Sequence, residues 1–225
     1  MTRQLAFDLP AQETWSREDF FVSPSNAVAL NTLDGWRDWP LRKLVLVGPA
    51  GAGKTHLTHL WADQAAARVL QARDLEDCDL AGFGPADAVA VEDADDIAGQ
   101  AAAEEALFHL HNIVMTNGHL LVTARRPVRD WGLGLPDLKS RLEAANMTRL
   151  DAPDDALLSA VLVKLFADRQ VSVPTNLIPW LVVRMERSLA AARAVVAALD
   201  ARALAEGKPI SRAMAAALLD SAEEE

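Results

Sequence analysis

The sequence predicts an α/β fold: a five-stranded parallel sheet flanked by helices, followed by a small all-α domain at the C-terminus. Three observations support this prediction. Apolar runs alternate with helical patterns along most of the chain, a glycine-rich turn joins the first run to a helix, and only helical patterns follow Val173-Pro174. Alternating strands and helices favour a parallel sheet because each strand must cross over before the next can run in the same direction.

Short continuous apolar runs predict strands that are covered on both faces. The clearest is Lys43 to Val47, which includes Leu-Val-Leu-Val. Four further strands are expected at Arg68 to Gln71, Asp87 to Glu92, His119 to Thr123 and Met147 to Leu150.

Apolar residues three or four positions apart predict the helices. In the α/β part these are Ser25 to Trp39, Gly53 to Ala67, Ala101 to Met115, Pro136 to Ala144 and Asp154 to Arg169. The C-terminal part has three more, at Leu177 to Met185, Leu189 to Leu204 and Ser211 to Leu219. Ser188 and Ser211 suit the N-cap positions of the last two helices, because a serine hydroxyl can accept a hydrogen bond from the first turn.

A phosphate-binding loop is predicted immediately after the first strand, where Gly48 to Thr55 reads Gly-Pro-Ala-Gly-Ala-Gly-Lys-Thr. Glycines allow backbone N–H groups to converge on phosphate oxygens, and the positive end of the following helix favours an anion. In such loops Lys54 would reach the β- and γ-phosphates and the Thr55 hydroxyl would bind Mg²⁺. The alternative is a glycine-rich turn with an incidental Lys-Thr pair, but the order strand, loop, helix favours an ATP or ADP site.

An acidic pair, Glu92-Asp93, ends the third predicted strand, where a nucleotide hydrolase would place its metal-binding acid. Glu92 is thus a candidate for Mg²⁺ binding and Asp93 for catalysis. Glutamate at the first place of the pair puts its carboxylate one methylene farther out than aspartate would. The alternative is an acidic loop, since Asp95 and Asp96 follow.

Composition and charge disfavour several other classes of protein. The net charge of −10 would repel a phosphate backbone, so direct DNA binding is the weaker hypothesis. The sequence has no long uncharged apolar run and a single cysteine, Cys78, which predicts a cytoplasmic protein without membrane contact. No acidic or cysteine partner completes a metal site with the histidines, and the tryptophans are expected in the core.

From Phe20 onward the chain resembles the DnaA-type AAA+ family and, within it, the Hda-like regulators of bacterial replication initiation. Four segments carry the resemblance: Phe-Phe-Val-Ser-Pro-Ser-Asn at 20–26, Leu-Val-Thr-Ala-Arg-Arg-Pro at 121–127, Leu-Lys-Ser-Arg-Leu at 138–142 and Ser-Leu-Ala-Ala-Ala-Arg at 188–193. Two positions depart from the family pattern. Ser23 replaces the usual glycine, and Arg125 stands where aspartate is common.

The resemblance implies an AAA+ fold with strand order 5-1-4-3-2 and assigns roles around a bound nucleotide. Asn26 would lie beside adenine, and Arg193 would approach the nucleotide from the helical lid. Arg141 would be an arginine finger that acts in trans on the nucleotide of a neighbouring subunit. The full set implied to contact the nucleotide is Asn26, Gly48, Gly51, Ala52, Gly53, Lys54, Thr55, His56, Thr123 and Arg193.

The N-terminal segment Gln4-Leu5-Ala6-Phe7-Asp8-Leu9 resembles the peptide with which bacterial proteins dock on the DNA polymerase sliding clamp. Leu5, Phe7 and Leu9 would fill apolar pockets while Gln4 forms hydrogen bonds. The expected organisation is a flexible clamp-binding segment at 1–19, an AAA+ nucleotide-binding domain at 20–172 and a helical lid at 173–225.

Together these features predict a regulator that inactivates the replication initiator DnaA. It would bind the sliding clamp (the polymerase III beta subunit) and stimulate hydrolysis of DnaA-bound ATP through Arg141, with at most weak ATPase activity of its own. The resemblance also implies a homodimer. Two alternatives stay open at this point: an initiator fragment or helicase-loader-like ATPase that contacts DNA, and an independent P-loop ATPase or kinase.

Overall fold

The computed structural model describes Arg17 and residues 20–222, and the predicted clamp-binding residues Gln4, Leu5, Phe7 and Leu9 lie outside this range. Five parallel strands of the described chain form one sheet in the order β2-β3-β4-β1-β5, which is the expected order read from the other edge. The strands are β1 (Lys43–Val47), β2 (Arg68–Gln71), β3 (Ala88–Glu92), β4 (His119–Ala124) and β5 (Asn146–Arg149). The predicted parallel α/β sheet is confirmed, with strand ends displaced by at most one residue.

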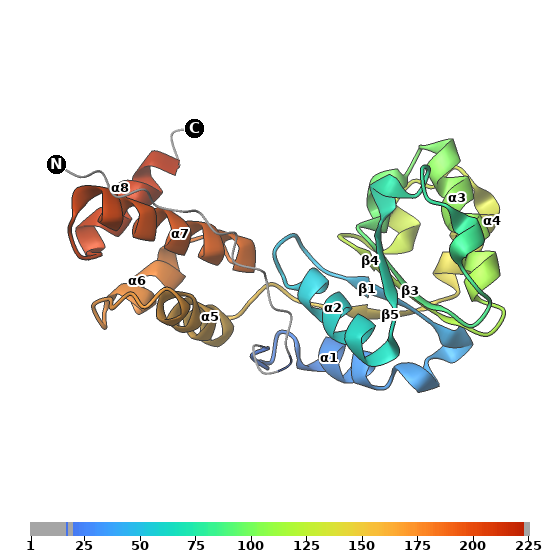
Figure 1. Cartoon of the computed structure of the whole chain (residues 1–225), viewed down its shortest axis with the longest axis horizontal. Coiled ribbons are helices and arrows are strands. Elements are labelled where there is room, and N and C mark those ends of the chain that lie inside the picture. The colour runs from blue at the N-terminus through green and yellow to red at the C-terminus, as the bar shows by residue number, and fades with distance from the viewer. Residues whose placement is uncertain (1–16, 18–19, 223–225) are drawn as a thin grey trace.

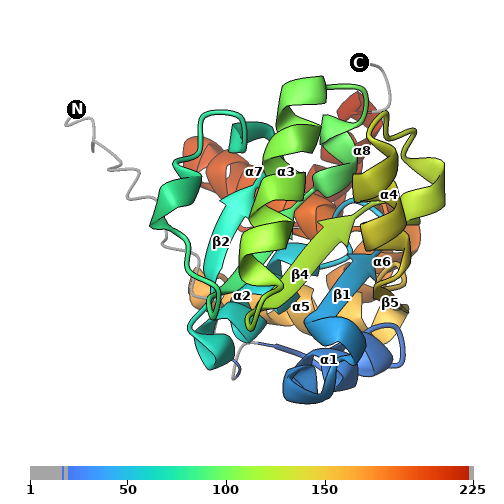
Figure 2. The ribbon, with the colours of Figure 1, turned by 90° about the vertical axis from the view of Figure 1, so that its right-hand side faces the viewer.

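Successive residues of β1 enter two different hydrophobic cores, one on each face of the sheet. Leu44 and Leu46 face the first core, formed with α1 (Ala27–Asp34) and α2 (Lys54–Ala65). Val45 and Val47 face the second, formed with α3 (Ala101–Val114) and α4 (Pro136–Glu143). Side chains alternate across a strand, so a sheet covered on both faces needs apolar residues at every position of its central strands. Figure 2 shows α3 in front of the sheet and α1 below it.

The first predicted helix is shorter than expected. α1 ends at Asp34, and Gly35 leads into a 3-10 turn over Trp36–Asp38. The two tryptophans after α1 pack against Trp61 in the core. Trp36 meets the Trp61 ring edge-on, and Trp39 stacks on it with ring centroids 5.4 Å apart. All three side chains are buried, as the sequence predicted.

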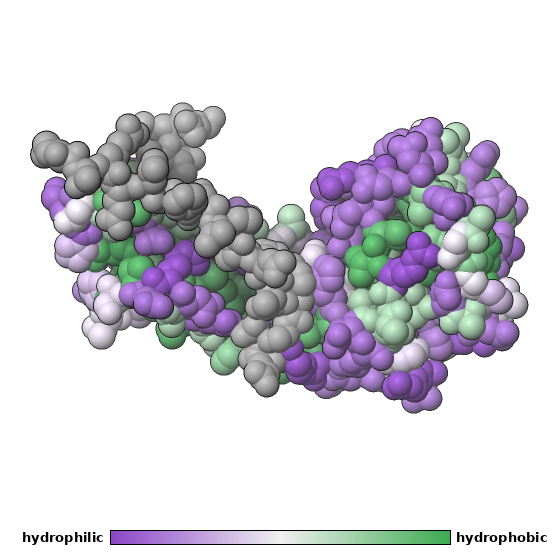
Figure 3. Space-filling view, viewed as in Figure 1, coloured by the Kyte–Doolittle hydropathy of each residue, from purple (hydrophilic) through white to green (hydrophobic). Residues whose placement is uncertain are grey.

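The helical domain consists of α5 (Asp155–Asp168), α6 (Leu177–Arg184), α7 (Leu189–Glu206) and α8 (Arg212–Ala222). Its core includes Leu158, Leu162 and Phe166 of α5, packed with α6 and α7. The sequence placed the division near residue 172, whereas α5 packs with the helices that follow it. Figure 1 shows α5 to α8 as a separate lobe beside the sheet, and the space-filling view shows the indentation between the two lobes (Figure 3).

Side-chain caps fix the starts of three helices in this domain. Ser188 Oγ accepts a hydrogen bond from Ala191 N, and Ser211 Oγ accepts one from Met214 N, so both predicted N-caps are confirmed. Asp154 caps α5 by accepting from Leu157 N at 2.8 Å. None of the helices over the described residues is long and apolar enough to cross a membrane.

Asp154 also joins the two domains, because its second carboxylate oxygen accepts a hydrogen bond from Ser25 N. The hydrogen bond from Leu157 N, with further ones from Ser23 and Ser25, lowers the pKa of Asp154 below its ordinary value of 3.8. A lowered pKa stabilises the fold above pH 4 or so, and this contribution disappears as the carboxylate becomes protonated on acidification.

Asp154→Ala is therefore expected to lower the free energy of unfolding by about 1 kcal/mol at pH 7. The deficit should shrink below about pH 4, where the wild-type carboxylate is itself protonated. Urea denaturation at pH 7 and at acidic pH measures both effects. Asp63→Ala, at an exposed position of α2, is the control and should leave stability within about 0.5 kcal/mol. A deficit independent of pH would contradict the role of the charged cap.

Candidate functional site

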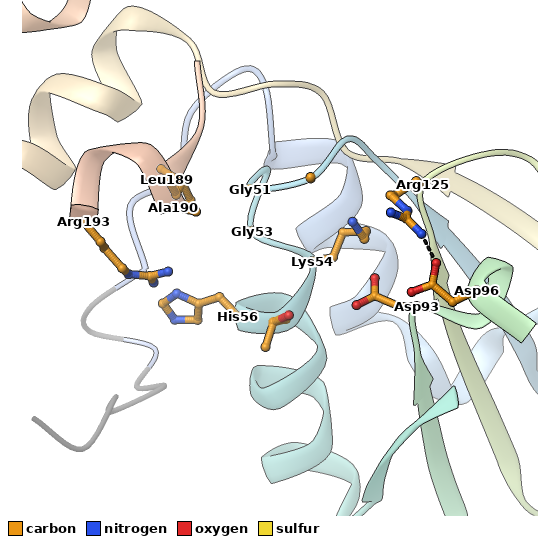
Figure 4. A pocket seen from close by; sticks show the side chains of 12 residues that line it. Gly51, Gly53, Lys54, His56, Asp93, Asp96, Arg125, Leu189, Ala190 and Arg193 are labelled. Atoms are coloured by element: carbon orange, nitrogen blue, oxygen red, sulfur yellow. Dashed lines mark hydrogen bonds and ion pairs between the residues drawn. The ribbon is translucent and has the colours of Figure 1, made fainter. Parts of the chain in front are cut away.

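A cavity of about 280 Å³ opens where the carboxyl ends of β1, β3 and β4 face the start of α7. The carboxyl edge of a parallel sheet is the usual place for ligands in α/β folds, since helix N-termini and loops converge there. Figure 4 shows residues from both domains around this cavity. The lining consists of Ala50, Gly51, Gly53, Lys54, Thr55, His56, Asp93, Asp96, Arg125, Leu189, Ala190 and Arg193.

The loop after β1 has a backbone that only glycine accommodates readily. Gly51 and Gly53 have φ angles of +68° and +106°. At Gly48, a side-chain carbon would lie 2.6 Å from the carbonyl oxygen of Leu150. These glycines let the loop turn tightly and deliver the chain to α2, whose positive end faces the cavity.

Lys54 is the first residue of α2, and its side chain is held over the backbone of the preceding loop. Its Nζ donates hydrogen bonds to the carbonyl oxygens of Gly48 and Pro49 at 3.0 and 3.2 Å. Burial lowers the pKa of Lys54, and the negative charges of Asp93 and Asp95 oppose that shift. A buried ammonium with carboxylates on one side can bind an anion that enters from the cavity.

The helical domain touches the loop directly. Leu189 N, at the first turn of α7, donates a hydrogen bond of 2.8 Å to the carbonyl oxygen of Gly51. Ser188 is buried against the same glycine, so that a side-chain carbon at Gly51 would lie 1.9 Å from Ser188 Oγ. One turn further on, Arg193 points into the cavity toward His56 (Figure 4). The predicted lid arginine thus lies beside the loop.

The acidic pair at the end of β3 divides its two side chains between core and cavity. Asp93 lines the cavity, and its backbone has a left-handed φ of +51°. Glu92 is buried and does not line the cavity: one carboxylate oxygen accepts from Gln71 Nε2 at 2.9 Å and the other has no hydrogen-bond partner. The hydroxyl of Thr123 is also buried, and accepts a hydrogen bond from Asp93 N at 3.0 Å. Thr123 therefore holds the backbone of Asp93 rather than lining the cavity.

Arg125, to which the sequence assigned no role, lines the cavity beside Lys54 and Asp93. Its guanidinium pairs with Asp96 and lies 3.5 Å from a carboxylate oxygen of Asp95. The signal that could have identified it was its position directly after β4, at the same sheet edge as the loop. Spacing alone does not show which of the adjacent residues Arg125 and Arg126 faces that edge.

A smaller recess adjoins the cavity, and Gly53, His56 and Leu189 line both. Its other walls include Phe20, Phe21, Asn26, Ala52 and Leu157. The Phe20 and His56 rings meet edge-on with centroids 5.1 Å apart. The side-chain amide of Asn26 forms hydrogen bonds within its own loop. It accepts one from Ser23 N and donates one to the Phe21 carbonyl oxygen. The recess has a volume of about 30 Å³, and apolar side chains make up most of its lining.

The oxygen-bearing side chains that face the cavity fit a hydrated Mg²⁺ bound together with a polyphosphate. Thr55 offers a hydroxyl and Asp93 a carboxylate, which are hard ligands of the kind Mg²⁺ prefers. Among the described residues no group of three or more histidine, cysteine or acidic side chains could hold a metal by itself. Much of the coordination would therefore have to come from phosphate and water.

Arg141 lies away from this cavity, on α4. That helix is on the side of the α/β domain that faces away from the helical lobe (Figures 1 and 2). The guanidinium is exposed and lies over the Phe108 ring, 5.0 Å from its centroid. Lys43 Nζ donates to the carbonyl oxygen of Arg141 and approaches His111 Nε2 at 3.4 Å. Burial, together with the charges of Lys43 and Arg141, lowers the pKa of His111 to about 4, which leaves this histidine neutral at pH 7.

Comparison with known proteins agrees with this geometry. No protein-family model matches the chain. The chromosomal replication initiator protein DnaA of Thermomicrobium roseum is 24% identical, and the match covers 88% of this chain and 48% of that protein. The chain thus spans about half the length of this curated relative.

Solved structures show the same fold. Domain III of the DnaA protein from Thermotoga maritima superposes with a TM-score of 0.76 at 20% identity, covering 92% of this chain and 96% of that domain. A DnaA bound to AMPPCP and single-stranded DNA superposes with a TM-score of 0.66 at 15% identity, covering 83% and 64% of the two chains. The chain has the fold of a DnaA-related AAA+ domain.

Lys54→Ala removes the one lysine of the cavity lining and is expected to lower affinity for ADP and ATP on the order of 100-fold, because the phosphates lose a charge-assisted partner. Titration with a fluorescent nucleotide analogue measures the loss. Lys164→Ala, in α5 and beside Asp168, removes the same side chain outside the cavity and should bind nucleotide as the wild type does. Equal affinity of the two variants would show that Lys54 does not bind the nucleotide.

Proposed function

Because the chain has the fold of the DnaA AAA+ domain, we propose that it binds ADP or ATP with Mg²⁺ and regulates DnaA by promoting hydrolysis of DnaA-bound ATP. The observation that carries the regulatory part is the separation of two arginine-bearing surfaces. Arg193 and Arg125 line the chain's own cavity, whereas Arg141 is exposed on the opposite side of the sheet domain. An arginine in that place can meet only a nucleotide bound by another molecule.

Nucleotide binding is supported by the arrangement of charges and apolar groups around the cavity. The positive ends of α2 and α7, with Lys54, favour a polyphosphate. The adjoining recess next to Phe20 and His56 suits the adenine ring. Thr55 and Asp93 would hold Mg²⁺, which would neutralise phosphate charge and orient the oxygens.

The way in which Arg141 is held suits an arginine that acts on the nucleotide of another molecule. Phe108 supports the guanidinium from one side, and Lys43 ties the last turn of α4 to the start of β1 through the Arg141 carbonyl oxygen. An arginine held in this way keeps a planar, permanently charged fork pointing outward. Such a fork can stabilise the charge that develops on a transferring phosphoryl group.

The proposed partners are DnaA, the polymerase sliding clamp and a second copy of this chain. The clamp would bind the peptide Gln4 to Leu9, which lies outside the described residues and supports this step through its sequence alone. Clamp binding would bring Arg141 to the DnaA molecules on newly replicated DNA. A raised local concentration of this kind can increase the rate of a weak encounter without any new contact.

A direct role on DNA is the main alternative, since one solved DnaA of this fold is bound to single-stranded DNA. The connection between β2 and β3 argues against it in this chain. It carries Asp74, Glu76, Asp77 and Asp79, whose negative charge would repel a phosphate backbone. A gel shift of the isolated protein at low salt distinguishes the two, because the DNA-binding alternative requires salt-sensitive binding without clamp or DnaA.

Arg141→Ala is expected to reduce stimulation of DnaA ATP hydrolysis, in the presence of clamp and DNA, by a factor on the order of 10³ while the variant's own nucleotide affinity stays unchanged. Arg141→Lys should recover little, because an ammonium lacks the planar fork. Arg129→Ala, which removes another exposed arginine of the same domain, serves as the control. Full stimulation by Arg141→Ala would exclude the proposed mechanism.

The paired substitution Gln4→Ala, Leu5→Ala is expected to abolish retention of the protein on immobilised sliding clamp, because it removes one hydrogen-bonding and one apolar contact. Nucleotide affinity should be unaltered, since the variant keeps Lys54 and Thr55, which line the cavity. If the variant is retained as well as the wild type, the clamp binds elsewhere on the chain or not at all.

A further inference from the structure

Three side chains lie along one face of α3, because Glu104, Phe108 and His111 occupy positions i, i+4 and i+7 of that helix. Each of them is connected to α4, which packs beside α3. We propose that this face of α3 positions Arg141 for its action on another molecule, with Glu104 as the principal positioning residue. The proposal rests on the function proposed above for Arg141 and adds the residues that hold it in place.

The carboxylate of Glu104 holds the start of α4. Glu104 is only 1% exposed. Leu135 N, at the N-cap of α4, donates to one carboxylate oxygen at 2.7 Å, and Gly134 N donates to the other at 3.1 Å. Gly99 N, just before α3, donates to that second oxygen as well, at 2.8 Å. Because Leu135 has no polar side chain, Glu104 supplies from α3 the hydrogen-bond acceptor that the start of α4 lacks locally.

A buried ammonium group holds the last turn of the same helix. Lys43 Nζ donates to the carbonyl oxygen of Arg141 and lies 3.4 Å from His111 Nε2. His111 is neutral at pH 7, since burial and the nearby positive charges lower its pKa to about 4, and a neutral imidazole can accept a hydrogen bond from an ammonium group. A carboxylate thus lies at the positive end of α4 and an ammonium at its negative end, which matches the dipole of the helix.

α4 is short enough to depend on these contacts for its direction. It has eight residues, and a helix of that length is marginal by itself. Leu138 and Leu142 attach it to the core, but apolar packing is not directional. Hydrogen bonds to single atoms at both ends are directional, although apolar residues in place of Glu104 and Lys43 would avoid the cost of burying two charges. The buried charges therefore favour a fixed position of α4, which an arginine that must meet a phosphate requires.

The middle residue of the α3 face supports the arginine side chain itself. Phe108 lies one turn beyond Glu104, and the guanidinium carbon of Arg141 is 5.0 Å from the centroid of its ring. This cation–π contact restrains the guanidinium and leaves its charge available for a phosphate. One face of α3 thus supports the start of α4, the guanidinium of Arg141 and, through Lys43, the backbone of Arg141.

The first test compares two adjacent glutamates of α3, one buried and one exposed. Glu104→Gln keeps the volume of the side chain and replaces one acceptor oxygen by an NH₂ group. It is expected to lower the maximal stimulation of DnaA ATP hydrolysis, with clamp and DNA present, about tenfold or more, because Arg141 is displaced. The protein concentration that gives half-maximal stimulation should change less than about threefold. Glu105→Gln, at the exposed position, should leave both values at those of the wild type.

Lys43→Met separates positioning from stability. The unbranched apolar side chain removes a buried charge, so the temperature of thermal unfolding should not fall, whereas maximal stimulation should drop as in Glu104→Gln. A residue that only stabilised the fold would lower both together. Lys208→Met, at an exposed position, is the control. If circular dichroism shows that Glu104→Gln is misfolded, the Lys43→Met result decides.

Substitutions of Phe108 test the support of the guanidinium. Phe108→Leu should lower maximal stimulation about twofold to fivefold, the size of an exposed cation–π contact, and Phe108→Tyr should restore it because an aromatic ring is again present. Equal stimulation by the leucine and tyrosine variants would overturn the role of the ring.

The outcomes separate the positioning role from the proposed function. If the wild type does not stimulate DnaA ATP hydrolysis, both proposals fail together. If stimulation depends on Arg141 but Glu104→Gln and Lys43→Met stimulate fully, only the positioning role is overturned. The same holds if these variants raise the half-maximal concentration and keep the maximal rate. A lower maximal rate in both, absent from Glu105→Gln, supports it.

Discussion

The contact between Gly51 and the first turn of α7 governs the relation between the two domains. Leu189 N donates to the Gly51 carbonyl oxygen, and Ser188 occupies the space where any side chain at Gly51 would lie. The same loop closes the floor of the cavity with its left-handed glycines. The contact between the domains and the floor of the cavity thus share one segment of backbone, so a ligand that shifted the loop would also displace the helical lobe.

A second constraint is the balance of charge at the carboxyl edge of the sheet. The chain as a whole carries a net charge of −10, yet Lys54, Arg125 and Arg193 all reach one cavity. Carboxylates pair with or stabilise two of these cations: the buried Asp95 and the exposed Asp96 pair with Arg125, while Asp93 and Asp95 favour the charged form of Lys54. The cavity is prepared for an anion before one arrives, which reduces the reorganisation that binding requires.

The sheet also separates the cavity from the surface that carries Arg141. The cavity faces the helical lobe, whereas α4 carries Arg141 on the other side, over Phe108. Strand β1 links them, since Val47 leads into the loop and Lys43, at its other end, binds the Arg141 carbonyl oxygen. Rigid central strands allow the two surfaces to keep a fixed distance and orientation. That geometry suits the action on a neighbouring molecule that we propose for Arg141.

Local sequence by itself determined the elements and the loop. The hydrophobic periods of strands and helices depend on neighbouring residues, so both ends of β1 and β2 were predicted correctly. The two serine N-caps were also predicted, because each hydroxyl bonds to a backbone N–H only three residues further along the chain. The glycine spacing likewise predicted the turn that forms one wall of the cavity. The departures arose where distant segments meet. Packing joined α5 to the helical lobe, turned Asp93 rather than Glu92 into the cavity, buried Thr123 behind it and chose Arg125 over Arg126 for its wall. Those choices depend on contacts between residues far apart in the chain, and only the tertiary structure decides them.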